Sequence, residues 1–178
     1  MIKEFDKYDM WGPYHWLWGS RKRHWYNRMI EFSLSHLTDK GSILDIGCGD
    51  GYVSAILKDK GFKVEGVDSN AKAISLAKTL LQDVNFYLTN IEELNIDKKY
   101  DYLYAQNVIE HMQDYKKIRE VFERYCDKYM ILITDMKGKL GRYEYSNVTF
   151  EDLKELFKEY KVELLFEYRK AYAVRISK

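Results

Sequence analysis

The sequence has few cysteines, almost no net charge and no long apolar run, and each shortage excludes a class of protein. Its two cysteines, Cys48 and Cys126, are too few and too widely spaced for a zinc site or a disulfide framework. The formal net charge of +1 gives no overall attraction to a polyanion. No apolar run approaches membrane-spanning length, and the first residues lack the apolar stretch of a signal peptide. We therefore expect a cytoplasmic protein with reduced thiols.

The residues that are present indicate one ordinary globular domain. A chain of 178 residues, 46% of them hydrophobic and 32% charged, can bury a core without cross-links. The only proline lies near the N-terminus among all four tryptophans: Trp11, Pro13, Trp16, Trp18 and Trp25. Such a cluster suits a lid or a binding wall, and it equally suits helices that pack onto the domain. We expect an aromatic-rich helical lid segment over residues 1–40 and a ligand-binding region over residues 41–178.

From residue 42 onward, short β-like runs alternate with helical patterns, which is typical of a parallel sheet covered by helices. The expected strands cover residues 43–46, 63–67, 85–88, 102–106 and 130–134. Two further β-rich runs, 162–168 and 171–176, predict a closing antiparallel hairpin, although its turn, Arg169-Lys170, matches the favoured hairpin turns poorly. The predicted fold is α/β: a Rossmann-like doubly wound sheet, mostly parallel, with a C-terminal antiparallel hairpin and helices on both faces.

Apolar residues three and four positions apart predict the helices. A helix ahead of the first strand is expected to pack through its apolar residues: Trp25, Met29, Phe32 and Leu37. The helix after the first strand should end at Gly61, and the next should span about 70–82 with Ser69 or Asn70 as its cap. A third helix is expected over 114–127. A fourth should begin at a capping box, Thr149-Phe150-Glu151-Asp152, and bury its apolar residues: Phe150, Leu153, Leu156 and Phe157.

A glycine-rich turn joins the first strand to the helix that follows: Asp45-Ile46-Gly47-Cys48-Gly49-Asp50-Gly51. In α/β sheets this turn is where nucleotides bind, because glycine lets a ligand approach the backbone closely. A turn that needs glycine for its geometry alone gives the same pattern. A dinucleotide site expects glycine where this chain has Tyr52, and a P-loop expects Gly-Lys-Ser/Thr, which Gly51-Tyr52-Val53 excludes. Phosphate is therefore not the obvious ligand.

The pattern Asp-x-Gly-x-Gly-x-Gly resembles the loop of class I S-adenosylmethionine-dependent methyltransferases. Three later segments resemble the same family in the same order: residues 64–68, 88–94 and 100–111. The resemblance implies S-adenosylmethionine as cofactor, with S-adenosylhomocysteine as product, and a set of cofactor-binding residues: Asp45, Gly47, Cys48, Gly49, Gly51, Asp68, Ser69, Asn90, Ile91 and Gln106. It places Asp45 near the methionine end of the cofactor and Asp68 against both ribose hydroxyls. Asn90 stands where the family commonly has an aspartate that accepts from the adenine amino group.

Methyl transfer from a sulfonium is an in-line displacement, so the protein mainly aligns donor and acceptor and excludes water. A hydroxyl acceptor also benefits from a base that takes its proton. Glu110 and His111 follow the fourth expected strand, at the edge where ligands bind in this fold, and are our first catalytic candidates. The alternative is that they only order the loop by hydrogen bonds.

His15 is the third catalytic candidate, because an N-terminal segment commonly closes over the cofactor in the enzymes that this chain resembles. A packing role is its alternative. Some family members take metal ligands from a Glu-x-x-Glu-His pattern, but this chain has Asn107-Val108-Ile109-Glu110-His111, which lacks one carboxylate. We therefore expect no metal.

The acceptor is left open by the sequence. The run Arg21-Lys22-Arg23-His24-Trp25 can hold phosphate or RNA, and it can also be a solvated helix start. Because the net charge is near zero, we expect a small-molecule acceptor, which this run suits if that molecule is anionic, rather than nucleic acid. The alternatives are an RNA or protein methyltransferase and a non-catalytic adenosyl-binding module. The sequence does not indicate an oligomeric state.

Overall fold

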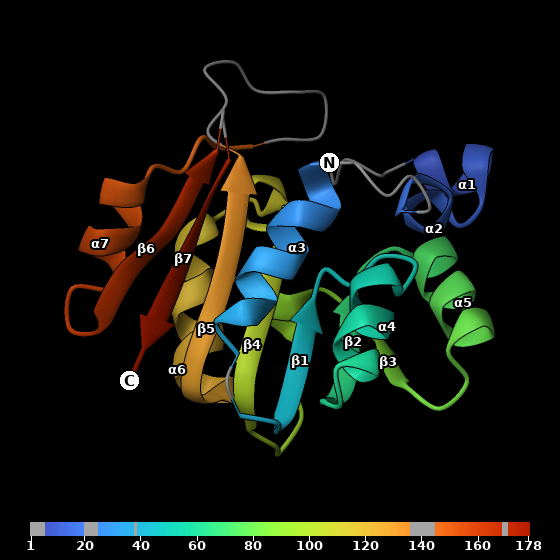
Figure 1. Cartoon of the computed structure of the whole chain (residues 1–178), viewed down its shortest axis with the longest axis horizontal. Coiled ribbons are helices and arrows are strands. Elements are labelled where there is room, and N and C mark those ends of the chain that lie inside the picture. The colour runs from blue at the N-terminus through green and yellow to red at the C-terminus, as the bar shows by residue number, and fades with distance from the viewer. Residues whose placement is uncertain (1–5, 20–24, 38, 136–144, 169–170) are drawn as a thin grey trace. The chain divides into compact units, whose positions relative to one another are not determined.

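The computed structural model describes residues 6–19, 25–37, 39–135, 145–168 and 171–178, and Figure 1 draws their helices and strands. The chain divides into two compact units, residues 1–93 and residues 94–178. In the described part, no helix has both the length and the apolar character needed to cross a membrane.

The first unit contains three parallel strands in the order β3-β2-β1. Its elements follow the chain in this order: α1 (Lys7–Trp11), α2 (Tyr14–Gly19), α3 (Trp25–Ser35), β1 (Ser42–Ile46), α4 (Tyr52–Asp59), β2 (Lys63–Asp68), α5 (Ala71–Leu80), β3 (Asn85–Leu88) and the 3-10 helix η1 (Ile91–Glu93). Because the strands are parallel and in register, with Asp45 opposite Gly66 and Asp68 opposite Leu88, their carboxyl ends meet at one edge. That edge carries the glycine loop.

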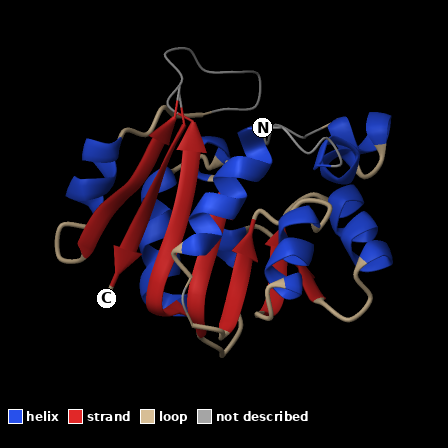
Figure 2. Ribbon diagram, in the orientation of Figure 1, coloured by secondary structure: helices blue, strands red, loops and turns tan. Residues whose placement is uncertain are grey.

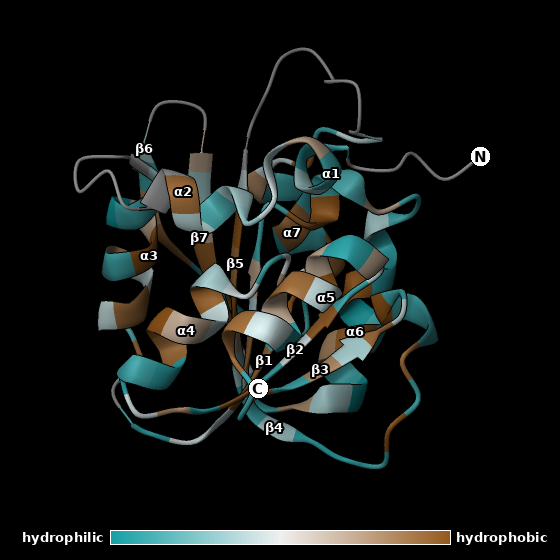
Figure 3. Cartoon of the chain, turned by 90° about the vertical axis from the view of Figure 1, so that its right-hand side faces the viewer, coloured by the Kyte–Doolittle hydropathy of each residue, from teal (hydrophilic) through white to brown (hydrophobic). Residues whose placement is uncertain are grey.

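Helices α4 and α5 are amphipathic, and Figure 3 shows apolar and polar residues side by side on both. Helix α4 buries Val53 and Leu57. Asn70, one of the two predicted caps, accepts a hydrogen bond from the Ala73 N–H at 2.9 Å and so starts α5. Local apolar spacing and capping chemistry thus place both helices where the sequence predicts them.

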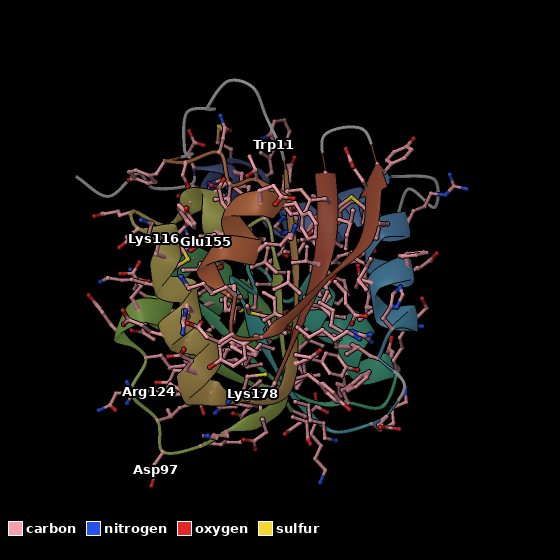
Figure 4. All side chains as sticks on the ribbon, turned by 90° about the vertical axis from the view of Figure 1, so that its left-hand side faces the viewer. Trp11, Asp97, Lys116, Arg124, Glu155 and Lys178 are labelled. Carbon is pink, nitrogen blue, oxygen red and sulfur yellow. The ribbon has the colours of Figure 1, made fainter. Side chains whose placement is uncertain are left out.

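The second unit contains four strands in the order β4-β5-β7-β6, and Figure 2 shows them in red. Its elements are β4 (Tyr100–Gln106), the 3-10 helices η2 (Ile109–His111) and η3 (Tyr115–Lys117), α6 (Ile118–Tyr125), β5 (Cys126–Asp135), α7 (Phe150–Leu156), β6 (Lys161–Tyr168) and β7 (Ala171–Ser177). Strands β4 and β5 are parallel, whereas β7 pairs antiparallel with both β5 and β6. Figure 4 labels Lys178 at the end of this unit; its ammonium donates to the main-chain carbonyls of Glu123 and Cys126.

These strands confirm the predicted fold class: the described residues form seven strands, mostly parallel, with antiparallel strands at the C-terminus. The capping box at Thr149 is also confirmed, since its side chain accepts from the Asp152 N–H at 3.1 Å. The predicted turn Arg169-Lys170 lies outside the described residues.

Some local predictions were only partly right. The helix expected over 114–127 is confirmed as α6, but its first turn is the 3-10 helix η3, and β5 already begins at Cys126 because the β-branched and aromatic run continues the chain into the sheet. Of the apolar residues predicted to pack at α3, Met29 and Leu37 are buried as expected, but Phe32 is 45% exposed. The helix buries Ile30 and Leu34 in addition. In α7, Leu153 and the following Phe157 are buried, but the predicted core residues Phe150 and Leu156 are only half-buried.

Candidate functional site

The glycine loop bends through three residues with positive φ angles. Gly47, Gly49 and Gly51 have φ of 66°, 54° and 81°, a region that other residues enter at a cost. Gly51 directly precedes α4, and a Cβ placed on it would lie 3.2 Å from side-chain carbons of Ala77 and Leu81. The backbone conformation and the close packing at these positions therefore require glycine. Of the three glycines, only Gly47 is exposed.

The N–H groups of this loop are already used inside the protein. Gly47 and Cys48 both donate to the Val67 carbonyl, at 2.8 and 3.1 Å, and Gly51 donates to the Cys48 carbonyl at 3.0 Å. Gly49 donates to Asp68 Oδ2 at 2.9 Å. Phosphate-binding turns instead direct such N–H groups at the anion. These four groups do not form a phosphate cradle.

Three carboxylates surround the same loop. Asp45 and Asp50 are buried, with 2% and 0% of their surfaces exposed, and Asp68 ends β2 beside them. Asp68 accepts through both oxygens: Oδ1 from the Asn70 N–H at 2.8 Å and Oδ2 from the Gly49 N–H at 2.9 Å. A carboxylate has about four acceptor positions, so each oxygen of Asp68 retains one for a ligand hydroxyl.

Burial raises the pKa of two of these carboxyl groups. The pKa of Asp45 rises to about 7, because desolvation and the nearby Asp68 outweigh a 2.6 Å hydrogen bond donated by Ser54 Oγ. The pKa of Asp68 is also raised by burial, against the opposing effect of its two backbone donors and of Lys7. A cation near these groups would favour their ionised forms. The loop is therefore electrostatically suited to a positively charged ligand.

Asp50 has a role that the sequence did not reveal. Its Oδ2 accepts from the His15 N–H at 2.8 Å, and its Oδ1 lies 2.9 Å from His15 Nδ1. Its carbonyl accepts from Trp16 Nε1 at 2.9 Å. Helix α2 is thus tied to the glycine loop through one aspartate, which occupies a variable position of the loop pattern and gave no signal beyond its place there.

Helix α1 contributes two further residues that sequence reasoning missed. The Tyr8 hydroxyl lies directly over Gly49, where it would clash with a Cβ, and Tyr8 is only 4% exposed. Lys7 Nζ lies 3.3 Å from His15 Nε2. Burial lowers the pKa of Lys7, although Asp50 and Asp68 oppose this shift. Helix α1 therefore covers Gly49 of the loop, and a lid function of the N-terminal segment stays a prediction.

The remaining predicted cofactor residues of the first unit lie along the same edge. The Thr89 N–H donates to the Asp68 carbonyl at the end of β2, at 3.1 Å. Asn90 is the next residue after Thr89 and therefore lies close to the end of β2. Asn90 is exposed and its side chain accepts from the Glu92 N–H at 3.3 Å, while Ile91 is buried. Ser69 is exposed. Cys48 is buried, and its sulfur lies against Gly66: a Cβ added to Gly66 would be only 2.9 Å from Cys48 Sγ. The Cys48 thiol therefore packs inside the protein.

The other candidates gather at the end of β4 in the second unit. Glu110 is 3% exposed; its Oε2 accepts from Thr134 Oγ1 at 3.0 Å. Gln106 is 7% exposed, and its Oε1 accepts from the Tyr104 hydroxyl at 2.8 Å. Asn107 has a φ of 54°, which is unusual outside glycine. Judged on the described residues, Gln106 Nε2 and Asn107 Oδ1 are buried without a hydrogen-bond partner.

The structure thus gathers the predicted site residues in two places. The loop residues, Asp68, Asn90 and His15 lie in the first unit, whereas Gln106 ends β4 in the second unit and is followed there by Glu110 and half-buried His111 on η2. Residues 21–24 of the basic run, and the side chain of Trp25, are outside the described part. Nowhere in the described ranges do three His, Cys, Asp or Glu side chains group as metal ligands, and independence of metal stays a prediction.

Comparison with known proteins shows similarity to methyltransferases. The family model of the methyltransferase domain matches residues 17–165. A ubiquinone biosynthesis O-methyltransferase from Rickettsia felis is 38% identical over 92 residues, and one from Rickettsia bellii is 36% identical over 94. The first alignment covers 48% of this chain and 38% of the relative; the second covers 49% and 39%. The aligned part therefore spans well under half the length of either relative.

Solved structures show the same fold at low identity. Magnesium protoporphyrin IX methyltransferase from Synechocystis PCC 6803, crystallised with S-adenosylmethionine, superposes with a TM-score of 0.67 at 15% identity, covering 85% of this chain and 77% of that one. The YcgJ protein from Bacillus subtilis superposes with a TM-score of 0.77 at 12% identity, covering 85% and 98%.

Proposed function

Because this chain belongs to the methyltransferase domain family, we propose that it transfers a methyl group from S-adenosylmethionine to a hydroxyl group of a small molecule. The support for a hydroxyl acceptor is the similarity to relatives named ubiquinone biosynthesis O-methyltransferases. We include an anionic acceptor in the proposal, since Arg21, Lys22 and Arg23 provide three cationic side chains in one short run.

The observation that carries the proposal is the set of polar groups around the loop. Four of its N–H groups donate to acceptors within the protein, and three carboxyl groups, Asp45, Asp50 and Asp68, surround it. A dinucleotide phosphate would meet carboxylates and no donor from these four groups, whereas a sulfonium nucleoside carries no phosphate and brings a positive charge. The residues present therefore fit S-adenosylmethionine better than NAD or ATP.

Each residue would then have a defined task. The second acceptor position on each Asp68 oxygen would take one ribose hydroxyl, and exposed Gly47 would allow the nucleoside to approach the backbone. The positive charge of the methionine end would favour the ionised form of Asp45, whose pKa burial raises to about 7. These groups and the α1–α2 segment would lower the barrier to in-line displacement by aligning the reactants and excluding water. When bound, the cofactor would supply the activated methyl group.

Calorimetry tests this function. The wild-type protein should bind S-adenosylmethionine and S-adenosylhomocysteine, and should not bind NADH or ATP. The variant Asp68→Asn keeps one oxygen for the loop but loses the charge, and should weaken binding of both nucleosides by about 1–3 kcal/mol, which is about 5- to 150-fold. The control Asp59→Asn removes an exposed carboxylate at the end of α4 and should bind like wild type. Binding of NADH without either nucleoside would overturn the proposal.

A further inference from the structure

A carboxylate and an imidazole are locked together over the glycine loop. Asp50 is completely buried, and both of its oxygens are occupied by His15, one by the backbone N–H at 2.8 Å and one by Nδ1 at 2.9 Å. A buried carboxylate requires hydrogen-bond donors. Nδ1 must therefore carry a proton, and in the neutral ring the lone pair lies on Nε2.

The imidazole ring is also held in one orientation by its neighbours. It stacks on Tyr26 with a centroid separation of 5.9 Å and an interplanar angle of 10°. The rings of Tyr14 and Tyr8 meet it in edge-to-face geometry, with centroid separations of 5.3 and 5.8 Å. A ring fixed on three sides and paired with a buried acid has the arrangement that activates an imidazole as a base.

The ring lies beside the proposed cofactor loop. Its Cε1 and Nδ1 atoms are 3.4 Å from the position of a Cβ on Gly49. Lys7 Nζ, 3.3 Å from Nε2, donates to the same nitrogen that a substrate hydroxyl would use. His15 also precedes residue 17, where the match to the family model begins, so the dyad does not follow from family membership.

We propose that Asp50 and His15 form the proton-accepting dyad for the hydroxyl acceptor; this inference rests on the proposed function. The O–H bond of the acceptor breaks as its proton passes to His15 Nε2, displacing the Lys7 ammonium from that nitrogen. The oxygen electron pair forms the new bond to the methyl carbon while the carbon–sulfur bond breaks and leaves its electron pair on sulfur. The proton then leaves His15 for solvent. Asp50 keeps the ring in the required tautomer and stabilises the imidazolium.

A chromogenic phenol tests the dyad without relying on turnover. We would bind 4-nitrocatechol to the complex with S-adenosylhomocysteine, because its visible absorbance reports ionisation of its hydroxyl. In the wild-type complex the bound probe should be ionised at a pH where the probe in solution is neutral. In His15→Gln and Asp50→Asn it should be bound in the neutral form. With S-adenosylmethionine, His15→Gln should reduce kcat for the same probe by about 100-fold or more, while KM for the cofactor changes less than threefold.

The variant Trp16→Phe separates proton transfer from anchoring. It removes the hydrogen bond from Trp16 Nε1 to the Asp50 carbonyl but leaves the imidazole–carboxylate pair intact. If the dyad only anchors α2, Trp16→Phe and His15→Gln should weaken cofactor binding alike. If the dyad accepts the proton, the probe bound to Trp16→Phe should still be in its ionised form.

The outcomes also separate this inference from the proposed function. Failure of the wild-type protein to bind S-adenosylhomocysteine would overturn the proposed function. Binding of S-adenosylhomocysteine with a neutral bound probe, with no bound probe, or with equal ionisation in His15→Gln would overturn the dyad alone. Imidazole ¹⁵N shifts give an independent readout in the ligand-free protein: a neutral His15 ring protonated on Nε2 rather than Nδ1 would contradict the assignment.

Discussion

The glycine loop of the first unit and the end of β4 in the second unit treat their polar groups in opposite ways. Around the loop, positive φ angles fall on glycines, four N–H groups have partners, and each carboxylate has donors. At the end of β4, an asparagine takes a positive φ, and among the described residues Gln106 Nε2 and Asn107 Oδ1 are buried without partners. The loop is complete before any ligand binds. The end of β4 has a strained backbone at Asn107 and two buried polar atoms without hydrogen-bond partners. Such features are typical of places where a ligand supplies the missing partner.

The most disruptive test of the loop is Gly49→Ala. The substitution should cost about 1–2 kcal/mol for the left-handed backbone and about 1–3 kcal/mol more for the clash with the Tyr8 hydroxyl. Gly12→Ala is a matched control, because Gly12 has a φ of 63° but no described atom lies within 4 Å of the added Cβ. Urea denaturation should show the larger loss of stability at Gly49. Equal losses would mean that the covering contact from α1 contributes nothing.

The pH dependence of Asp45 tests whether the loop holds its carboxylates at a cost. The folded-state pKa of about 7 lies above the usual 3.8, so the folded protein favours the neutral acid. Stability is therefore greatest below the pKa of the unfolded chain and is lost as pH rises toward 7. Relative to Asp45→Asn, the wild type should lose about 2 kcal/mol between pH 5 and pH 7. A difference that is constant with pH would contradict this assignment.

Sequence patterns predicted the loop side of this comparison better than the β4 side. The strand over residues 85–88 and the Asn70 cap depend on short-range spacing and were predicted correctly. The Asp50–His15 pair joins residues 35 positions apart, and no periodicity records such a contact. The insertion of β7 between β5 and β6 was missed for the same reason: the chain order of the last two strands does not specify which one pairs with β5. Strain at Asn107 became visible only in the backbone angles.

Asn107→Gly tests the second region. Glycine adopts a φ of 54° without strain, which should recover about 1–2 kcal/mol, while its greater freedom in the unfolded chain should remove about 0.5–1 kcal/mol of that gain. We expect a net stabilisation of about 0.5–1 kcal/mol with lower methyl transfer, because the unpaired Oδ1 is removed. Thermal unfolding and a labelled-methyl assay measure the two effects. A variant that gains stability and keeps full activity would show that the strain serves no ligand.

The smallest expected difference concerns two helix caps, whose loss should change stability alike. Asn70→Ala removes the bond to the Ala73 N–H in the first unit, and Thr149→Ala removes the bond to the Asp152 N–H in the second. Each should cost about 0.5–1 kcal/mol, because a backbone donor loses its side-chain partner at an end that water still reaches. Chemical denaturation of both variants measures these costs. Asp68 Oδ1 also accepts a hydrogen bond from the Asn70 N–H, so the Asn70 cap holds the backbone that positions Asp68. Asn70→Ala should therefore weaken S-adenosylhomocysteine binding slightly, whereas Thr149→Ala should leave it unchanged. An equal effect of both variants on binding would show that the cap does not help to orient Asp68.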